Sequence, residues 1–475
     1  MSIVAHSRSA GALLSTDGSR SRACRVGVIG TYGQGNLGDE AVFVSFVQWV
    51  AENAPHIEPV ALCANPAYIE KTYGVSAYPV SPRHAGTVRR VEGGQRGPAA
   101  AGPQHRRTNA PAATRRPIGR LRDSAVDSLP GFARVLRPPW RLLKGFLVAA
   151  RFLPRQLRLS RSLDGVIVLG GGQIHDFWDG PFGHPVALWS WALASRLTGR
   201  PFAMLSIGAV KLDHGMSRRF IRAALQWSVY ATVRDRVSAS WVASLGLPRA
   251  YPVYPDLAWG LDVTRFVGHP RASGQPDEVP TQNSSLRTVG VCPMAFRHPK
   301  LWARGQADAE AYARYVDAMS TFCNRLLDRG YDLVLFPTQI RMDAAAVRDV
   351  LERITPELVH RVRLWPVDSV PELVKCMASV DVVVASRFHG LLLALCAGRP
   401  VLSLAYQKKC SALLEELGEG QFGLDIHDFT AQELWERFER LRDRFGVYAA
   451  RLQAHIEENR RKIDAQYQSY FARLC

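Results

Sequence analysis

The segment of residues 380–409, VDVVVASRFHGLLLALCAGRPVLSLAYQKK, most constrains what this chain can fold into. Its two short apolar runs, 381–385 and 401–405, contain no turn residue, which is typical of buried parallel strands. The stretch between them, 389–397, has helical length and an apolar surface, and a Gly-Arg-Pro sequence follows it as a stop signal. The segment therefore predicts a strand, a helix and a second parallel strand.

Cationic side chains follow the carboxyl ends of both predicted strands. Ser386, Arg387 and His389 come directly after the first strand, at the start of the helix, and Lys409 follows the second. Residues in these positions face the ligand crevice of an open parallel sheet, and a helix N-terminus favours anions. The pattern predicts an anion site. The alternative is that Arg387 and His389 only cap the helix or lie on its surface.

The length of 475 residues exceeds one ordinary hydrophobic core and indicates two domains. Apolar runs alternate with helical stretches on both sides of a Pro-, Gly-, Ser- and Gln-rich segment, so we expect two doubly wound, Rossmann-like α/β domains facing a cleft. The predicted parts are a disordered leader (1–24), a first domain (25–262), a linker (263–286), a second domain (287–430) and a charged C-terminal helix (431–475) that crosses back. The expected strands are 25–30, 56–63, 77–80, 165–169, 202–207, 231–233, 250–254, 289–292, 333–336, 362–364, 381–385 and 401–405.

Two glycine-rich loops follow predicted strands of the first domain. The first strand runs into TYGQGNLGDEA, and the strand at 165–169 runs into GGGQIHD. Such loops bring the backbone close to a ligand. Glycine-rich turns also recur in many α/β folds without binding anything, and an Asp in such a loop can be a helix cap. The residues of these loops predicted to bind a ligand are Gly33, Gly35, Asn36, Asp39, Gly171, Gly172, His175 and Asp176.

The formal net charge of +18 comes largely from residues 83–161, a basic insertion in the first domain. The first part of the insertion is rich in Gly, Pro, Ala and Arg and predicts disorder. The second part interleaves Trp140, Phe146 and Phe152 with Arg and Lys, which suits an anionic membrane surface or a basic helix packed on its own domain. No nucleic-acid motif accompanies the charge, so we expect no nucleic-acid partner. No apolar stretch is long enough to span a bilayer.

The eight cysteines are scattered without metal-ligand spacing. We therefore expect no metal site, and a reducing cytosol rather than a disulfide framework.

Four stretches resemble the polysaccharide pyruvyl transferase family: GTYGQGNLGDEA (30–41), VIVLGGGQIHD (166–176), TVRDRVSAS with the later PDLA (232–240 and 255–258), and ASRFHGLLLALCAGRPVLSLAYQKK (385–409). The resemblance implies a glycosyltransferase-B-like fold. It also implies transfer of a pyruvyl group from phosphoenolpyruvate to a sugar, with formation of a cyclic ketal and release of phosphate. By position it assigns active-site roles to Arg387, His389 and Lys409, and donor contact to Arg234 beside Ser386. The basic insertion and Gln407-Lys408 depart from the family pattern.

The residue types fit this chemistry. Arg387, Arg234 and Lys409 could clamp the carboxylate and phosphate of the donor, and His389 could protonate its methylene carbon as a general acid. The first domain would hold the sugar or a lipid-linked precursor, which would bring a cytoplasmic protein to the inner face of the plasma membrane. No cofactor beyond phosphoenolpyruvate as co-substrate is expected. The alternatives are a nucleotide-sugar glycosyltransferase of the same build and a non-catalytic glycan-binding assembly protein. The sequence indicates no oligomeric state.

Overall fold

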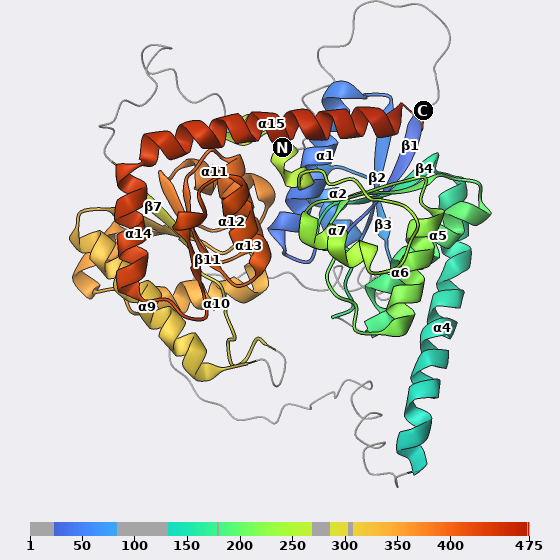
Figure 1. Ribbon diagram of the computed structural model, residues 1–475, viewed down its shortest axis with the longest axis horizontal. Coiled ribbons are helices and arrows are strands. Elements are labelled where there is room, and N and C mark those ends of the chain that lie inside the picture. The colour runs from blue at the N-terminus through green and yellow to red at the C-terminus, as the bar shows by residue number, and fades with distance from the viewer. Residues whose placement is uncertain are drawn as a thin grey trace, which may run out of the picture.

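The computed structural model describes residues 23–82, 132–177, 180–267, 286–302, 307–472 and 474, and within α4 it describes the side chains of 145 and 147–161. Residues 1–22 of the predicted leader, the first part of the basic insertion and most of the predicted linker lie outside the described residues, and Cys24, predicted to end the leader, begins β1. Two six-stranded parallel sheets, each covered by helices, form the body of the protein (Figure 1). The prediction of two doubly wound α/β domains is confirmed.

The first sheet has the order β3-β2-β1-β4-β5-β6. The strand predicted at 250–254 is wrong, because Val253 makes only an isolated bridge to Val233. Pro252 and Pro255 flank this residue, and a proline cannot donate to a sheet ladder. The strands are β1 (Cys24–Ile29), β2 (Ile57–Cys63), β3 (Ala77–Pro79), β4 (Gly165–Leu169), β5 (Phe202–Ile207) and β6 (Tyr230–Val233).

Different helices cover the two faces of this sheet. Phe43 of α1 packs with Ile167 and Leu205 on one face, whereas Trp191 of α5 packs with Val168 on the other. The alternation of inward side chains along each strand supplies both cores. The helices are α1 (Leu37–Asn53), α2 (Pro66–Tyr73), α4 (Phe132–Arg161), η1 (Gly180–Phe182), α5 (His184–Leu197), α6 (Gly215–Trp227), α7 (Arg236–Ala243), η2 (Leu257–Gly260) and α8 (Thr264–Val267).

The second sheet has the order β12-β11-β10-β7-β8-β9. Its strands are β7 (Thr288–Cys292), β8 (Asp332–Leu335), β9 (Val362–Leu364), β10 (Val382–Ala385), β11 (Val401–Ala405) and β12 (Gly423–Asp425). The predicted strand–helix–strand unit is confirmed as β10, α12 and β11, whereas the edge strand β12 was not predicted. The helices are α9 (Ala309–Asp328), α10 (Ile340–Leu351), η3 (Pro356–Arg361), α11 (Val370–Ala378), α12 (Phe388–Cys396), α13 (Lys408–Glu416), η4 (Gly420–Phe422), α14 (Ala431–Asp443) and α15 (Phe445–Phe471).

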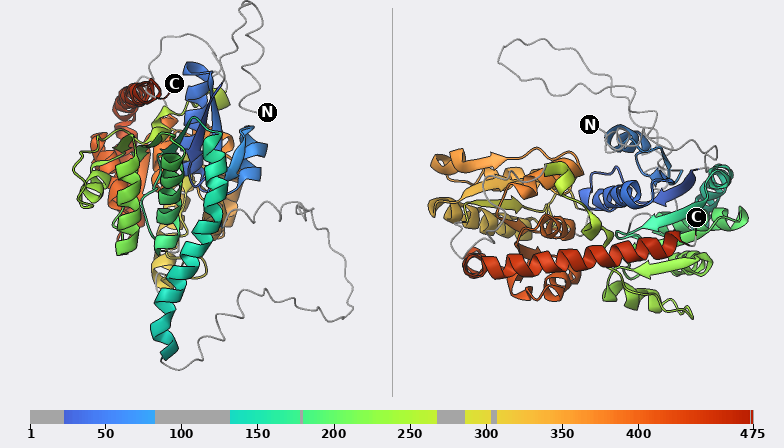
Figure 2. Two further views of the ribbon diagram at one scale, coloured as in Figure 1. Left: turned by 90° about the vertical axis from the view of Figure 1, so that its right-hand side faces the viewer. Right: turned by 90° about the horizontal axis from the view of Figure 1, so that it is seen from above.

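The long helix α15 runs across both domains (Figures 1 and 2). Near its start, the Tyr448 hydroxyl donates to the carbonyl of Val401 in the second domain, at 3.4 Å. Near its end, Asp464 accepts a hydrogen bond from the indole of Trp49 in the first domain, at 2.8 Å. Phe471 stacks on the same indole, and the ring of Tyr467 packs against it at a tilt. The helix therefore joins the two domains through their cores as well as through the chain.

The cysteines divide into two groups. Cys24 is disulfide-bonded, so the expectation of reduced cysteines is wrong at this position. The free and buried cysteines are Cys63, Cys292, Cys323, Cys376, Cys396 and Cys410. Across the described ranges, none of the helices has the length and apolar character that crossing a membrane requires.

Candidate active site

A cavity of about 750 Å³ lies between the two domains. Loops after the strands of both sheets line it, as expected for a ligand crevice at the carboxyl ends of parallel strands. Its volume lies within the usual range for small-molecule sites. Eight residues predicted from the sequence meet in its lining: Asn36, Asp39, Gly172, His175, Arg234, Arg387, His389 and Lys409.

Arg387 precedes α12 and is held by a buried carboxylate. Its Nε and Nη2 donate to the two oxygens of Asp343, at 2.6 and 2.7 Å. The same carboxylate accepts the backbone N–H of Gln339, at 3.0 Å, and is fully buried. Burial disfavours the charged guanidinium, but Asp343 outweighs that effect and raises the pKa of Arg387. The guanidinium is thus fixed in place with its Nη1 side left for a ligand.

Arg234 and Lys409 flank the aromatic ring of Phe388. The guanidinium carbon of Arg234 lies 5.0 Å from the ring centre, and Nζ of Lys409 lies 5.1 Å from it. Arg234 also pairs with Asp256 at 3.0 Å and with Asp235 at 3.2 Å. Lys409 has no such carboxylate partner within the described part of the chain. It is therefore the cation of this cluster that an anionic ligand would neutralise most directly.

His389 faces the first domain across the cleft. Its Nε2 is buried without a hydrogen-bond partner among the described residues and lies 4.0 Å from Oδ1 of Asp39. Burial lowers the pKa of His389 to about 4; Asp39 opposes this shift, whereas Arg234, Lys409 and Arg387 add to it. The imidazole of the free protein is therefore neutral at pH 7.

The domain contact at His389 requires a glycine. A Cβ at Gly38, the second residue of α1, would lie 1.8 Å from the ring of His389. Gly38 belongs to the first glycine-rich loop, and the sequence predicted no contact between it and His389. Its position under the imidazole shows that this glycine fixes how closely the second domain approaches the first.

Polar contacts hold the first glycine loop against both domains. The Asp39 carboxylate accepts from the side chains of Thr31 and Asn36, each at 2.8 Å. The carbonyl of Gly35 accepts from the backbone N–H of Ile340 in the second domain, at 3.0 Å. Gly33 and Gly35 both have φ of 79° and shape the loop, but they do not line the cavity.

Glu40 supports this loop from below. It accepts hydrogen bonds from Tyr68 and Tyr73, each at 3.0 Å, and from the backbone N–H of Gly33, at 3.2 Å. Burial raises the pKa of Glu40 to about 7 in spite of these bonds. The Tyr68 hydroxyl also lies 3.1 Å from the carbonyl of Asp368 in the second domain.

Only some of the residues predicted in the second glycine loop line the cavity. The His175 ring stacks on those of Phe177 and His184, and burial lowers the pKa of His175. Asp176 accepts from the backbone N–H of His214, at 3.0 Å, so it holds a loop rather than lining the cavity. Burial raises the pKa of Asp176, but its hydrogen bonds lower it by more.

Two more predicted residues lie outside the cavity lining. Gly171, with φ of 62°, passes within 2.8 Å of an Asp39 oxygen, measured from the position of its absent Cβ. Ser386 is buried, and its hydroxyl lies 2.8 Å from that of Tyr315. Both residues support the site from behind.

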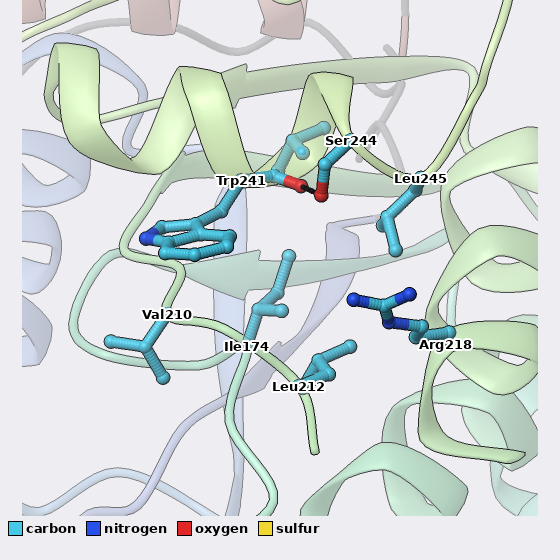
Figure 3. A pocket seen from close by; sticks show the side chains of 8 residues that line it. Ile174, Val210, Leu212, Arg218, Trp241, Ser244 and Leu245 are labelled. Atoms are coloured by element: carbon cyan, nitrogen blue, oxygen red, sulfur yellow. Dashed lines mark hydrogen bonds between the residues drawn. The ribbon is translucent and has the colours of Figure 1, made fainter. Parts of the chain in front are cut away.

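A second, much smaller cavity lies beside the first and shares Ile174 and Val210 with it (Figure 3). Its volume is about 10 Å³, and its walls include Leu212 and Trp241. This is at most the space of one water molecule. It is a packing gap rather than a ligand site.

Two residues that build the site were missed by sequence reasoning. Asp343 lies in the first turn of α10, after β8, and only the fold reveals that it meets Arg387. Phe388 stands between Arg387 and His389 and reads as a core residue of α12. The signal available for Asp343 was its place shortly beyond the carboxyl end of the predicted strand 333–336.

Two Rossmann-like domains that enclose a cationic cleft define a glycosyltransferase-B-like α/β protein, and solved structures agree with this class. HepE from Anabaena, in complex with UDP, has a TM-score of 0.51 and 13% identity over 95% of this chain and 100% of its own. A Listeria monocytogenes protein described as a UDP-N-acetylglucosamine 2-epimerase has a TM-score of 0.54 and 10% identity over 95% and 98%. At these identities the likeness shows the fold alone.

The sequence comparison defines the family. The family model "Polysaccharide pyruvyl transferase" matches residues 36–408, and the chain belongs to this family. No curated protein matches the chain.

Proposed function

We propose that this protein transfers a pyruvyl group from phosphoenolpyruvate to two hydroxyls of a sugar, in a cell-surface polysaccharide or its lipid-linked precursor, and releases phosphate. Family membership supports pyruvyl transfer to a polysaccharide. The observation that carries the proposal is the buried, unpartnered Nε2 of His389, which lies among Arg234, Arg387 and Lys409 and opposite Asp39.

The donor is held through its carboxylate and phosphate. Lys409 supplies an ammonium without a carboxylate partner among the described residues, and Arg387 supplies the Nη1 side of a guanidinium that Asp343 already orients. Arg234, which lines the same cavity beside Phe388, contributes further positive charge. Pre-oriented cations at this position stabilise the charge that develops on the departing phosphate.

Different residues, His389 and Asp39, carry out the proton transfers. Protonated His389 donates to the methylene carbon of the donor, using the double-bond electrons, so the central carbon becomes electrophilic. A sugar hydroxyl bonds to that carbon, and Asp39 takes the hydroxyl proton. The bond to phosphate then breaks with its electron pair, and a second hydroxyl closes the ketal. One hydroxyl proton returns to His389 through Asp39, and the other leaves with phosphate, so protons balance.

Donor binding supplies the charge that His389 needs. In the free protein burial and three cations hold the pKa of His389 at about 4, so the imidazole lacks its acidic proton. A bound polyanion opposes those cations and raises the pKa. The acid is thus formed in the complex rather than in the free protein.

The location follows from the acceptor. A lipid-linked sugar is reached from the cytoplasm at the inner face of the plasma membrane. There the basic residues of α4 would meet anionic lipid.

The test is phosphate release from phosphoenolpyruvate with a panel of lipid-linked and nitrophenyl sugars, with mass spectrometry for the ketal. His389→Ala should lose about 1,000-fold of the rate, within the range of general acid catalysis. His360→Ala, an exposed histidine of η3, is the matched control and should keep the wild-type rate. Absence of release with every acceptor, together with thermal stabilisation by a UDP-sugar, would instead favour glycosyl transfer.

A further inference from the structure

The interdomain cavity continues away from the cationic cluster along α4, and there its character changes. We call this part the apolar arm. Its walls come from α4, η1, α5 and the loop before η1: Gly145, Val148, Ala149, Phe152, Phe177, Phe182, Val186 and Ala187. None of these side chains is charged. The arm and the cluster around His389 belong to one cavity, so a single ligand can occupy both.

Several polar groups at the edge of the arm are already bonded within the protein, although Nδ1 of His175 is buried without a hydrogen-bond partner among the described residues. Nε2 of His184 lies 2.7 Å from the side-chain oxygen of Gln173. The Ser190 hydroxyl accepts from the side chain of Gln156, at 2.9 Å, and donates to the carbonyl of Ala187, at 3.0 Å. A sugar hydroxyl in the arm would find few groups to replace its bonds to water, whereas hydrocarbon loses nothing there and gains by leaving water.

The helix that forms one wall is also the most basic element of the fold. The sequence of α4, FARVLRPPWRLLKGFLVAARFLPRQLRLSR, has eight Arg or Lys residues and no acid. The helix extends well past the rest of the first domain (Figures 1 and 2). Next to the arm it exposes Leu147 and Val148, at 49% and 38% of their surface. Apolar and cationic side chains together on one helix suit an anionic membrane surface, from which the hydrocarbon chain of a ligand would enter the arm.

We propose that the apolar arm binds the hydrocarbon chain of a lipid-phosphate-linked sugar acceptor. The sugar then lies at His389 and Asp39, the chain lies along Ala149 and Phe152, and the linking phosphate lies between them in the same cavity. The proposal rests on the proposed function only for what happens at the sugar end. The arm itself is a binding site whose occupancy can be measured without catalysis.

The proposal that the arm binds hydrocarbon is tested by comparing two prenyl phosphates. The affinity of the full chain for each is measured by calorimetry. Farnesyl phosphate carries the hydrocarbon, and dimethylallyl phosphate carries the same phosphate on a single isoprene unit. Wild type should bind farnesyl phosphate at least about tenfold more tightly, because burying hydrocarbon is favourable. Equal affinity for the two would overturn the proposal.

Neighbouring alanines of α4 supply a matched pair of variants. Ala149 lines the arm, whereas Ala150 is exposed and does not. Ala149→Trp should fill the arm and remove the preference for farnesyl phosphate, whereas Ala150→Trp should keep it. Val148→Ser, which removes apolar surface without adding bulk, should weaken farnesyl phosphate binding severalfold even if Ala149→Trp fails to fold. Equal binding by all three variants and wild type would contradict the proposal.

Enzyme kinetics distinguish failure of this proposal from failure of the proposed function. Ala149→Trp should raise KM for a farnesyl-diphosphate-linked sugar about tenfold and leave a nitrophenyl sugar unaffected. If no acceptor is pyruvylated while the variants still differ in farnesyl phosphate binding, the proposed function fails and the arm stands. If nitrophenyl sugars are pyruvylated and chain length changes neither KM nor binding, the arm fails and the function stands.

Discussion

The two walls of the cleft are built differently. The charged side chains of the second domain's wall come from one continuous stretch, β10 to α13, with Arg387, His389 and Lys409 all lining the cavity; Thr338, Gln339 and Met342, after β8, complete this wall. Opposite the cationic cluster, the wall from the first domain consists of loops after separate strands, and many polar side chains there hold those loops in place. Asp39 binds Thr31, and Glu40 binds two tyrosines.

The difference teaches which kind of change each wall tolerates. In the second wall, charge and proton transfer reside in a few side chains, so conservative substitutions there should remove activity. In the first wall, the shape of the loops matters most, so changes should act through stability and through the closeness of the domains.

Asp343→Asn gives the largest expected effect, because it leaves the buried guanidinium of Arg387 without its carboxylate. Breaking a buried ion pair costs about 3–5 kcal/mol of the free energy of unfolding. Denaturant unfolding of the wild type and the variant measures this loss. The control is Asp317→Asn, whose exposed pair with Arg353 should contribute less than about 1 kcal/mol. Equal losses in the two variants would show that Arg387 is not held as the structure indicates.

The pH dependence of stability tests the role of Glu40 in the first wall. Burial raises the pKa of Glu40 to about 7 from an ordinary value of 4.5, so between these values the folded protein keeps a proton that the unfolded chain has released. Stability should therefore fall as pH rises through this window, by about 3 kcal/mol from this group, and stay level above it. Unfolding of wild type and Glu40→Gln across this range measures the difference. Parallel pH profiles would rule out a buried, protonated Glu40.

Lys409→Met tests whether the second wall binds the donor. Removal of the ammonium should lower kcat/KM for phosphoenolpyruvate about 100-fold, which corresponds to about 2.7 kcal/mol. Lys375→Met, at an exposed lysine paired with Glu372, should change nothing. Steady-state kinetics at varied donor concentration gives the result. An unchanged KM and kcat in Lys409→Met would remove this lysine from the donor site.

Gly38→Ala tests how the walls meet. Its methyl group would lie where the ring of His389 now packs, so the domains must separate or the loop must shift. We expect a loss of about 2 kcal/mol in stability, as for other overpacked sites. Activity should fall together with stability. Gly199→Ala is a useful comparison, because open space surrounds that glycine although its φ of 68° adds strain. Wild-type kinetics in Gly38→Ala would mean that His389 need not touch the first wall.

The smallest expected effect is the uptake of a proton when the donor binds. Because the pKa of His389 is about 4 in the free protein and an anionic donor raises it, binding of phosphoenolpyruvate at pH 7 should take up about one proton. Calorimetry in two buffers of different ionisation enthalpy measures this uptake. It should disappear in His389→Ala, and uptake that persists in that variant would assign the proton to another group.

The sequence predicted the fold well because its strongest signals were local. Buried parallel strands such as β4 and β10 are unbroken apolar runs, and the glycine loops mark strand ends. The three-residue strand β12 is too short to carry a pattern. Pairings between distant segments, such as Arg387 with Asp343 or His389 over Gly38, depend on how the two sheets are placed, and no local pattern contains that information. Asp176 and Ser386 have the right positions beside strand ends, but their side chains turn into the protein.

The contact between α15 and α1 has a consequence for synthesis on the ribosome. Trp49 and its partner Asp464 are 415 residues apart, and Phe46 stacks on Phe471 in the same place. The aromatic side of α1 therefore emerges early and waits, uncovered, until nearly all of the second domain has been translated. During that interval it is an exposed hydrophobic surface on the nascent chain, which favours chaperone binding and carries a risk of aggregation.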